Sequence, residues 1–470
     1  EQGLKQAAAD FGVHPKKELW KLPAMYVGDY AEQDAALTLK LWQAFKIKLR
    51  QDEVESIFNV ETEVFPVLFD MTRRGIRFDR DKCEQLINQM RRREREILAE
   101  LKQICGKNVD IWAAQSVAQA FDAVHIPYSK TENGLPSFTK GFLDSCEHPI
   151  AKLIVEARET NKTHSTFLEP YLNFSAKTGR IHPHVNQMRS DDGGTVTGRL
   201  SMANPNLQQV PARHEVIGPM VRSLFLPEEG QLWASNDFSS QEPRLLVHYA
   251  NLLGLPGADV MVDAYRGDPN TDFHQMVADM AGIKRKAAKT IGLGLMYGMG
   301  KNKLAGQLDL SLDEASELID TFHRNVPFLK GTVNAVMKRI EHPAAGGAIR
   351  TLLGRKCRFP LWEPMEWGVN KALPREQAVM EYGQRIKRAG TYKGLNRLIQ
   401  GSAADQTKAA MVALAKNGFT PILQVHDEVA LSVKSREEAE AAADIMATAV
   451  RMEVPSRCDV EVGPSWGQAK

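Results

Sequence analysis

The sequence predicts an α+β protein of several domains, and three observations support this. The chain has 470 residues, enough for about three domains of roughly 150 residues each. Short β-prone runs occur near the middle and near the end of the chain, and the long region between them has a helical pattern. Apolar residues make up 43% and charged residues 25%, the ordinary balance of a globular protein.

The composition also excludes several classes of protein. No stretch approaches about 18 uninterrupted apolar residues, so we expect no membrane span. The net charge of +2 does not by itself indicate a polyanionic partner. The five cysteines are widely spaced and lack a C-x-x-C pair, so we expect reduced packing residues rather than disulfides or a zinc site. Because the chain begins at Glu1 without a signal-peptide pattern, we expect a fragment or processed form of an intracellular protein.

The first third of the chain is predicted to be mainly helical. An apolar stripe from Tyr30 to Phe45 indicates one helix, and a second helical pattern from 60 to 107 is interrupted at Gly75. The second part of that pattern carries a basic run, which could bind phosphate or form a solvated helix face relieved by intervening glutamates. The basic run consists of Arg91, Arg92, Arg93, Arg95 and Lys102. Residues 128–141 are rich in Ser, Thr, Asn, Gly and Pro and predict an exposed loop with a mobile tip.

Two β-prone runs, Leu232 to Phe238 and Pro421 to Val433, predict strands that flank a helical insertion over about 243–346. Asp237 lies at the end of the first run, where a carboxylate is a plausible metal ligand. The run His426-Asp427-Glu428 places carboxylates inside an apolar β pattern, where they need a partner or a cation. The same run also fits a structural ion pair, or a tight hairpin with Asp427 near its tip.

Between these runs, Arg285, Lys289, Leu293 and Tyr297 recur at four-residue steps and would form one stripe on a helix. Two cations followed by an apolar and an aromatic side chain suit a nucleotide, because the cations can hold its phosphates. The alternative is a dinucleotide loop built on the nearby glycines. That alternative is disfavoured because the spacing is G-x-G-x-x-x-G and a basic helical run, not a strand, precedes it.

Five motifs in this order resemble those of family A DNA polymerases, the family of the bacterial DNA polymerase I large fragment and its phage relatives. The motifs are Thr197-Gly198-Arg199-Leu200-Ser201 with Asn204-Pro205-Asn206-Leu207-Gln208, then Asp237 to Arg244, Arg285 to Gly298, Asn396-x3-Gln400-Gly401, and His426-Asp427-Glu428. Tyr30 to Asp34 resembles the last motif of the proofreading exonuclease, and Gly463 to Trp466 resembles the family's C-terminus. The resemblance therefore covers nearly the whole chain.

The resemblance implies a role for each motif. Asp237 and Asp427 would hold two Mg²⁺ ions, which Mn²⁺ could replace, with Glu428 as a further catalytic residue close by. Arg285 and Lys289 would bind the incoming triphosphate, Lys289 also acting in catalysis, and Leu293 and Tyr297 would complete the nucleotide site. Glu242 would leave no room for a ribose 2′-hydroxyl. The DNA-binding residues would be Arg199, Asn396, Gln400 and His426 in the minor groove, with Arg244 in support.

The resemblance also implies a right-hand architecture. Residues 1–55 would be a remnant of a 3′–5′ exonuclease domain, 56–180 the thumb, 181–244 the first part of a palm with an antiparallel sheet, 245–395 helical fingers, and 396–470 the second part of the palm. In the thumb, the basic run near Arg92 would favour phosphate contact, with binding that weakens as salt rises.

The implied function is template-directed DNA synthesis in replication or repair, in which deoxynucleotides are added to a primer 3′-hydroxyl and pyrophosphate is released. The implied partners are primer-template DNA and deoxynucleotides. We expect a monomer without membrane association, in the cytoplasm of a bacterium or of a phage-infected host.

Several residues depart from the family pattern. Leu293 stands where Phe or Tyr is usual, which predicts discrimination against dideoxynucleotides. Ser240 and Pro243 are unusual neighbours for Glu242 and put its local geometry in doubt. Proofreading is not expected, because only about 50 residues precede the thumb and they lack the Asp-x-Glu pair, which would leave Asp34 as a relic.

Three rival functions are less consistent with the sequence. An inactive DNA-binding protein of the same shape would not need Asp237, Lys289, Tyr297 and Asp427 together. A single-subunit RNA polymerase would have to admit the 2′-hydroxyl that Glu242 excludes. A nicotinamide oxidoreductase would need a strand before the glycine run and an acidic residue after the next strand, and neither arrangement occurs.

Overall fold

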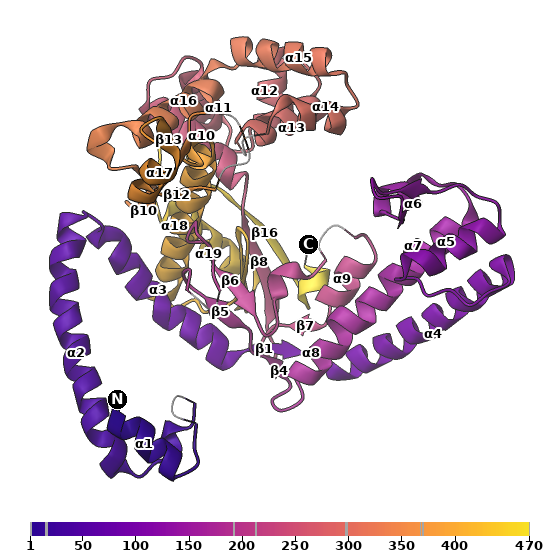
Figure 1. Ribbon diagram of the computed structural model, residues 1–470, viewed down its shortest axis with the longest axis horizontal. Coiled ribbons are helices and arrows are strands. Elements are labelled where there is room, and N and C mark those ends of the chain that lie inside the picture. The colour runs from indigo at the N-terminus through magenta and orange to yellow at the C-terminus, as the bar shows by residue number, and fades with distance from the viewer. Residues whose placement is uncertain are drawn as a thin grey trace.

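A computed structural model gives the architecture and describes residues 2–14, 17–190, 193–211, 214–296, 299–366, 368 and 371–469. A four-stranded sheet lies at the centre, with one helical group above it and a second beside it (Figure 1). This arrangement confirms the predicted α+β fold class. All five cysteines are free thiols. In the ranges given above, none of the helices combines the length and the apolar character that a membrane span requires.

The central sheet is antiparallel and has the strand order β14-β15-β8-β16. Its strands are β8 (Leu232–Phe238), β14 (Pro421–Val425), β15 (Glu428–Val433) and β16 (Cys458–Gly463). Both predicted β runs are therefore strands, and the second forms the predicted hairpin with His426 and Asp427 in its turn. The interior of β8, from Trp233 to Asn236, is buried on both faces of the sheet.

Three helices cover one face of this sheet: α3 (Glu55–Arg74), α18 (Gly394–Lys416) and α19 (Arg436–Thr448). Val64 of α3, Met411 of α18 and Leu431 of β15 belong to one buried apolar cluster. Helix α3 begins at the start of the segment 56–180 that we expected to form the thumb, but it packs against α18 and β14 of the central sheet. The helical period identifies the buried face of α3 but not the element that covers it.

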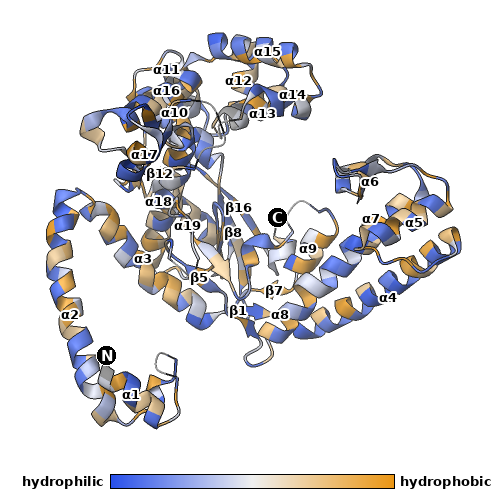
Figure 2. Cartoon of the chain, in the orientation of Figure 1, coloured by the Kyte–Doolittle hydropathy of each residue, from blue (hydrophilic) through white to orange (hydrophobic). Residues whose placement is uncertain are grey.

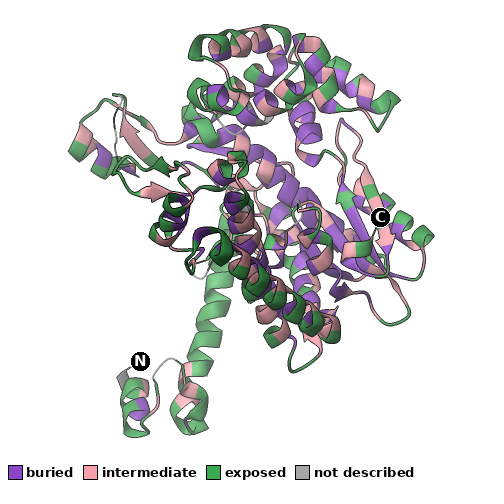
Figure 3. Ribbon diagram, turned by 90° about the vertical axis from the view of Figure 1, so that its right-hand side faces the viewer, coloured by how far each residue is buried: buried purple, intermediate pink, exposed green. Residues whose placement is uncertain are grey.

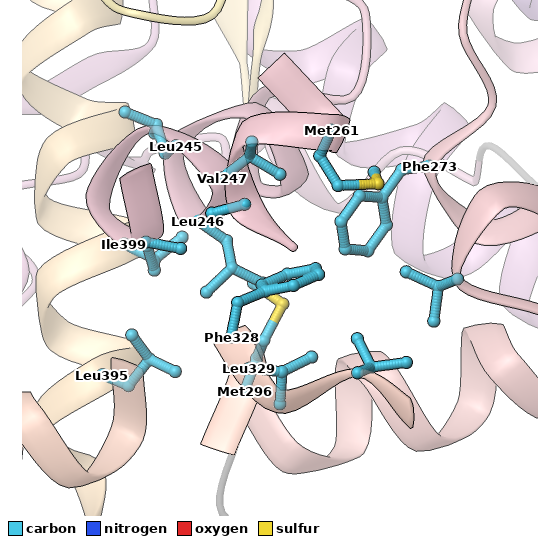
Figure 4. Close-up of a cluster of buried hydrophobic side chains, with 14 of the residues drawn as sticks. Leu245, Leu246, Val247, Met261, Phe273, Met296, Phe328, Leu329, Leu395 and Ile399 are labelled. Carbon is cyan, nitrogen blue, oxygen red and sulfur yellow. The ribbon is translucent and has the colours of Figure 1, made fainter. Parts of the chain in front are cut away.

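The region predicted as a helical insertion is helical. It contains α10 (Gln241–Leu252), α11 (Ala258–Gly267), α12 (Phe273–Ala281), α13 (Arg285–Met296), α14 (Lys301–Leu308), α15 (Leu312–Asn325) and α16 (Pro327–Glu341). Leu246, Phe273 and Phe328 from three of these helices pack in one core (Figure 4). Leu395 and Ile399 of α18 belong to the same core, so the insertion is anchored on the helix that covers the sheet.

Two small antiparallel sheets connect α16 to α18. The first pairs β9 (Ala348–Arg350) with β10 (Lys356–Arg358). The second contains β11 (Leu361–Pro364), β12 (Leu373–Pro374) and β13 (Ile386–Arg388), with α17 (Arg375–Tyr382) packed beside β11.

The second helical group contains α4 (Arg80–Cys105), α5 (Ala114–Ala123), α6 (Lys140–Ser145), α7 (Pro149–Lys162), a π-helical turn (Thr163–Leu168) and α8 (Glu169–Phe174). Helix α4 begins where the Asp79 side chain accepts a hydrogen bond from the Lys82 N–H, and it ends at Gly106, whose φ is 71°. The predicted loop over 128–141 is mostly exposed but includes a hairpin of β2 (Ser129–Lys130) and β3 (Pro136–Ser137).

Short elements join this group to the central sheet. They are β1 (Ile76–Phe78), β4 (Arg180–Ile181) and β7 (Phe225–Leu226) in one small sheet, β5 (His184–Asn186) paired with β6 (Ser201–Ala203), and α9 (Ile217–Arg222). Gly75, where the helical pattern breaks, separates α3 from β1 with a φ of 63°.

The N-terminal part contains α1 (Gln2–Asp10) and α2 (Ala24–Gln51), and α2 includes the predicted helical stripe. None of the residues of α2 is buried, and the helix extends away from the body of the molecule (Figure 3). Polar and apolar residues alternate along it (Figure 2). At its end, the Asp52 carboxylate accepts hydrogen bonds from Lys356 Nζ at 2.6 Å and Arg358 at 2.9 Å, which tie α2 to β10.

Candidate active site

Two aspartates predicted as metal ligands meet at one end of the sheet. Asp237 is the penultimate residue of β8, and Asp427 lies in the turn between β14 and β15. The Phe238 N–H donates to the Asp427 carbonyl at 3.3 Å, which holds the turn beside the end of β8. In the register of the sheet, both Glu428 and Asp459 lie opposite Asp237. The fold therefore gathers carboxylates from three strands.

The electrostatic state of these carboxylates is unusual. Asp237 is open to solvent at its outer side, yet desolvation by the surrounding protein, followed by the negative charges of Asp427 and Glu428, raises its pKa to about 8. Burial also raises the pKa of Asp427, although His426 and Arg199 act in the opposite direction. A cation between Asp237 and Asp427 would relieve this repulsion. The donor set therefore fits a hard divalent metal.

The two aspartates do not form a complete metal cage by themselves. In the described ranges, no group of three or more His, Cys, Asp or Glu side chains has the arrangement of a metal site. Mg²⁺ commonly binds through one or two carboxylates and takes its remaining ligands from water and substrate phosphates. The site is consistent with that mode of binding.

Glu428 is positioned differently from the two aspartates. Its Oε1 accepts hydrogen bonds from the Ser235 hydroxyl at 2.5 Å and the Trp466 indole N–H at 3.1 Å. Burial raises the pKa of Glu428, and these two donors partly offset that effect. Glu428 thus lies close by, as expected, but its carboxylate is engaged with the residues beneath the site.

Arg199 and Glu242 form an ion pair beside the turn that carries Asp427. Arg199 Nη2 lies 2.5 Å from Glu242 Oε1, and the Glu242 side chain is only 15% exposed. Both residues influence the pKa of Asp427, Arg199 lowering it and Glu242 raising it, so the three charges are close neighbours. Ser240, at the start of α10, has a φ of 51°, and α10 presents Glu242 in its first turn despite the unusual Ser240 and Pro243.

Besides Arg199, the residues expected to contact the minor groove lie on two elements. His426 is exposed in the β14–β15 turn with a φ of 59°. Asn396 and Gln400 lie one turn apart on α18 and are half-buried, and their side-chain amides make no hydrogen bond to another residue in the described part of the chain. A glycine is favoured at position 401, next to Gln400, because a Cβ there would lie 2.6 Å from the Thr351 side chain and 3.3 Å from the Thr197 carbonyl.

Arg244 does not fit the DNA-binding group. It is 2% exposed, and its guanidinium donates to the carbonyls of Ser239 at 2.8 Å, Pro455 at 2.6 Å and Pro269 at 2.5 Å. Its donors are therefore used inside the protein, and the expectation that Arg244 binds DNA is corrected to a purely structural role. The hydrogen bonds of Arg244 connect the β8–α10 turn to the segment just before β16 and to the helical insertion.

Helix α13 carries the predicted triphosphate ligands. Lys289 is exposed, and Arg285 forms an ion pair with Asp272 at 2.8 Å. No hydrogen bond or ion pair between described residues joins α13 to the carboxylates of the sheet. The side chain of Leu293 and the whole of Tyr297 lie outside the described residues.

His274 is a residue of this region that the sequence reasoning missed. It lies in the first turn of α12, which packs against α13. Burial, followed by the positive charge of Lys289, lowers its pKa, and its buried Nδ1 has no hydrogen-bond partner within the described ranges. A histidine two residues after the helix cap Asp272 gave no signal of its own in the sequence, because only the fold brings it beside Lys289.

A second group that the sequence reasoning missed lies beneath Arg199. Two cations and two carboxylates form a buried ionic cluster, which we call the palm cluster: Glu61, Arg355, Asp405 and Lys408. Lys408 Nζ lies 2.8 Å from Glu61, and Arg355 contacts both Glu61 and Asp405. Gly198 has a φ of 85°, and a Cβ there would lie 2.8 Å from the Arg355 guanidinium. The palm cluster therefore fixes the backbone that precedes Arg199.

Two of the five residues in the basic run of α4 form ion pairs within the second helical group. Arg93 contacts Glu156 at 2.7 Å and Glu100 at 3.3 Å, and the hydrogen bond that it donates to the Glu156 carboxylate raises the pKa of the Arg93 guanidinium further. Arg91 pairs with Glu169 at 3.0 Å. These two residues therefore serve helix packing, whereas Arg92 and Arg95 are exposed and stay candidates for phosphate contact.

The chain belongs to DNA polymerase family A, a family of DNA-directed DNA polymerases, because the family model matches residues 80–468. A protein named DNA-directed DNA polymerase from Pseudomonas phage M6 is 40% identical over 99% of this chain and 74% of that protein. Thermostable DNA polymerase I from Thermus aquaticus is 30% identical over 95% of this chain and 53% of that protein. Both the recognised family and the expectation of phage relatives are thereby confirmed.

A solved structure supports the same conclusion for the fold. It is described as the POL domain of Pol1 from M. smegmatis in complex with DNA primer-template and dNTP. The match has a TM-score of 0.73 and 27% sequence identity, and it covers 91% of this chain and 74% of the other. The mixed helical and sheet architecture is therefore that of a family A polymerase domain.

Proposed function

We propose that the chain is a template-directed DNA polymerase that adds deoxynucleotides to a primer 3′-hydroxyl and releases pyrophosphate. The observation that carries this proposal is the convergence of Asp237 and Asp427, with raised pKa values, beside the Arg199–Glu242 pair. The relative solved with DNA primer-template and dNTP supports these as the partners of this chain also.

Asp237 and Asp427 would hold Mg²⁺ ions. When bound, two such ions lower the pKa of the primer hydroxyl and neutralise charge on the substrate phosphates in an in-line displacement. Glu428 would not be a ligand in this scheme. Through Ser235 and Trp466 it would keep a negative charge close to Asp237 and fix the turn that carries Asp427.

The triphosphate would bind along α13. Lys289 is exposed and ready for a phosphate, whereas Arg285 would exchange its contact with Asp272 for one with the substrate. His274 would add a neutral ring nitrogen beside Lys289, since its pKa is lowered. The charges of Lys289 and Arg285 would offset the negative charge that develops during phosphoryl transfer. Leu293 and Tyr297 stay proposed contacts of the sugar and base.

Sugar and base-pair selection would depend on the group beside Asp427. Glu242, held by Arg199, would occupy the space that a ribose 2′-hydroxyl needs. Arg199, His426, Asn396 and Gln400 would donate to the minor groove. The acceptors there are nearly the same for every correct base pair, so these contacts would test the shape of the pair and not its sequence.

We further propose that this chain acts as a monomer and does not proofread. Asp34, the one residue that resembles an exonuclease ligand, is exposed on α2. The absence of proofreading is tested by incubating the chain with a labelled single strand and Mg²⁺, since shortening of that strand from its 3′ end would contradict it. The monomeric state is tested by light scattering coupled to size exclusion, and a mass of twice 52.4 kDa would contradict it.

The decisive experiment is extension of a labelled primer on a DNA template with Mg²⁺ and either deoxynucleotides or ribonucleotides. We expect deoxynucleotide extension, and Asp427→Asn should reduce its rate by about a thousandfold, which corresponds to about 4 kcal/mol of transition-state stabilisation. Asp313→Asn, at an exposed carboxylate of α15, serves as the matched control and should leave the rate unchanged. Primer-template binding without extension would indicate an inactive binding protein, and a preference for ribonucleotides would indicate an RNA polymerase.

A further inference from the structure

A surface of stacked arginines and aromatic rings lies on the small sheet of β11, β12 and β13. The Trp362 ring of β11 is flanked by Arg388, whose guanidinium carbon is 4.6 Å from the ring centroid, and by Arg375 at 5.7 Å. Trp362 and Arg388 are directly paired across β11 and β13, so their side chains are on the same face of the sheet. Arg375 comes from the start of α17, which packs against β11.

This surface is linked to α18 through Phe359, which is itself buried. Arg388 Nη1 donates to the Phe359 carbonyl at 3.0 Å, and Arg397 of α18 lies over the Phe359 ring with 4.6 Å between guanidinium carbon and centroid. We call the three cations Arg375, Arg388 and Arg397, with Trp362 and Phe359 between them, the arginine ridge. Helix α17 contacts both β11 and β13 of the small sheet.

The charge of the arginine ridge is not neutralised by the fold. No carboxylate forms an ion pair with Arg375, Arg388 or Arg397 within the described residues. Residues 358–397 contain eight basic and four acidic side chains, whereas the whole chain carries only +2. The buried Arg355 nearby shows the opposite situation, since Glu61 and Asp405 both pair with it. A concentration of unpaired guanidinium groups on a nearly neutral protein points to an anionic partner.

The location of the arginine ridge narrows the choice of partner. Arg397 is the next residue after Asn396 on α18, and Asn396 with Gln400 forms the proposed minor-groove contact. Tyr392, just before α18, is 55% exposed and presents an aromatic ring at the same end of the helix. Planar guanidinium groups bind phosphates and stack on bases, and exposed aromatic rings stack on unpaired bases. Paired bases in a duplex do not present their faces in this way.

We propose that the arginine ridge binds the single-stranded template strand next to the primer-template end. This inference rests on the proposed polymerase function and adds a DNA-binding surface to it. Trp362 and Phe359 hold the guanidinium groups in fixed positions, so less conformational entropy is lost when phosphates bind. The template strand would then already be aligned along α18 when it reaches the proposed catalytic residues.

The test compares binding of two primer-templates by fluorescence anisotropy, one with a template overhang of about 2 nucleotides and one with about 12. The variant is Arg375→Ala combined with Arg388→Ala, and the matched control is Lys387→Ala, because the neighbouring residue in β13 points to the opposite face. Since Arg388 also holds the Phe359 carbonyl, Arg375→Ala alone is measured too, and thermal melting checks that each variant is folded.

We expect the double variant to weaken binding of the long overhang by about tenfold relative to the short one. The dependence of log affinity on log salt concentration should flatten by about 1.4, from two lost phosphate contacts at about 0.7 each on a single strand. Lys387→Ala should change neither value, and Arg375→Ala should give an intermediate effect. An unchanged ratio in the folded double variant would overturn the proposal, as would the same loss when the overhang is made double-stranded. Failure of the unmodified chain to bind or extend the short-overhang substrate would instead overturn the polymerase function.

Discussion

The substitution Lys408→Met removes one cation from the palm cluster, which contains two cations and two carboxylates. The Lys408 side chain is 1% exposed and that of Glu61 is 9% exposed, and Lys408 Nζ contacts both oxygens of Glu61 at 2.8 and 3.0 Å. The ammonium also donates to the Gln187 carbonyl at 2.9 Å. After the substitution, the cluster would carry a net negative charge away from water.

The expected loss of stability follows from this burial. Burial pushes the pKa of Glu61 upward, but Lys408 and Arg355 together bring it below its ordinary value, so the carboxylate depends on both cations. Removal of one partner from a buried ion pair typically costs about 3–5 kcal/mol. Met has nearly the length of Lys, so the change leaves little empty volume and isolates the loss of charge.

The same two helices provide a control. Lys416 of α18 pairs with Glu63 of α3 at 2.7 Å, but these side chains are 62% and 47% exposed. Lys416→Met should therefore cost at most about 1 kcal/mol, because solvent screens an exposed pair. The assay is urea unfolding followed by tryptophan fluorescence, with midpoints compared at a common dependence on urea.

The result that would refute this reasoning is a Lys408→Met variant no less stable than Lys416→Met. A second check is the double variant Glu61→Gln with Lys408→Met, which removes the unpaired carboxylate together with its cation. We expect it to be about 1–3 kcal/mol more stable than the sum of the two single changes predicts. Strict additivity would show that the two side chains do not interact.

Three further outcomes are expected. In the absence of metal, Asp237→Asn should raise the thermal unfolding temperature by an amount that grows between about pH 4 and about pH 8 and then levels off. Over this range the folded wild-type aspartate, with its pKa near 8, still holds a proton that the unfolded chain has released, so its contribution to stability falls as the pH rises. A gain that shrinks with pH would contradict the raised pKa. Gly198→Ala should destabilise the folded chain by about 1–3 kcal/mol, since the residue has a φ of 85° and the new Cβ meets Arg355; calorimetry showing no change would refute the tight contact. Leu293→Tyr should raise incorporation of dideoxynucleotides relative to deoxynucleotides in a single-nucleotide assay, and an unchanged ratio would end that expectation.

Much of the sheet and its carboxylates could be predicted from the sequence. The run Leu232 to Phe238 is β-prone over its whole length and coincides with β8, and the acidic turn in Pro421 to Val433 interrupts an otherwise apolar pattern. Both signals are local, because a buried strand needs apolar residues and a tight turn needs particular backbone angles. The register that brings Asp237 opposite Glu428 is not local, and only the family resemblance gave a reason to pair them.

The errors arose where tertiary contacts decide the role of a side chain. Arg244 has the same chemistry as Arg199 and lies in a motif beside Glu242, yet one guanidinium is covered by carbonyl groups and the other faces a carboxylate at the site. Glu61 and Lys408 are 347 residues apart, and neither lies in a motif. Helical periodicity places Glu61 and Lys408 on the inner faces of their helices, but it cannot show that the two buried side chains contact each other.

The interior position of β8 in the sheet affects how readily its backbone amides exchange with solvent. The strand is hydrogen-bonded to β15 on one side and to β16 on the other, so its amides should exchange with solvent only when the whole sheet unfolds. The helices of the insertion lack such ladders and depend on their shared apolar core, so their amides are expected to exchange earlier. Local unfolding of the insertion would then leave Asp237 in register with Glu428 and Asp459, so the three carboxylates would keep their places while the helices above them open.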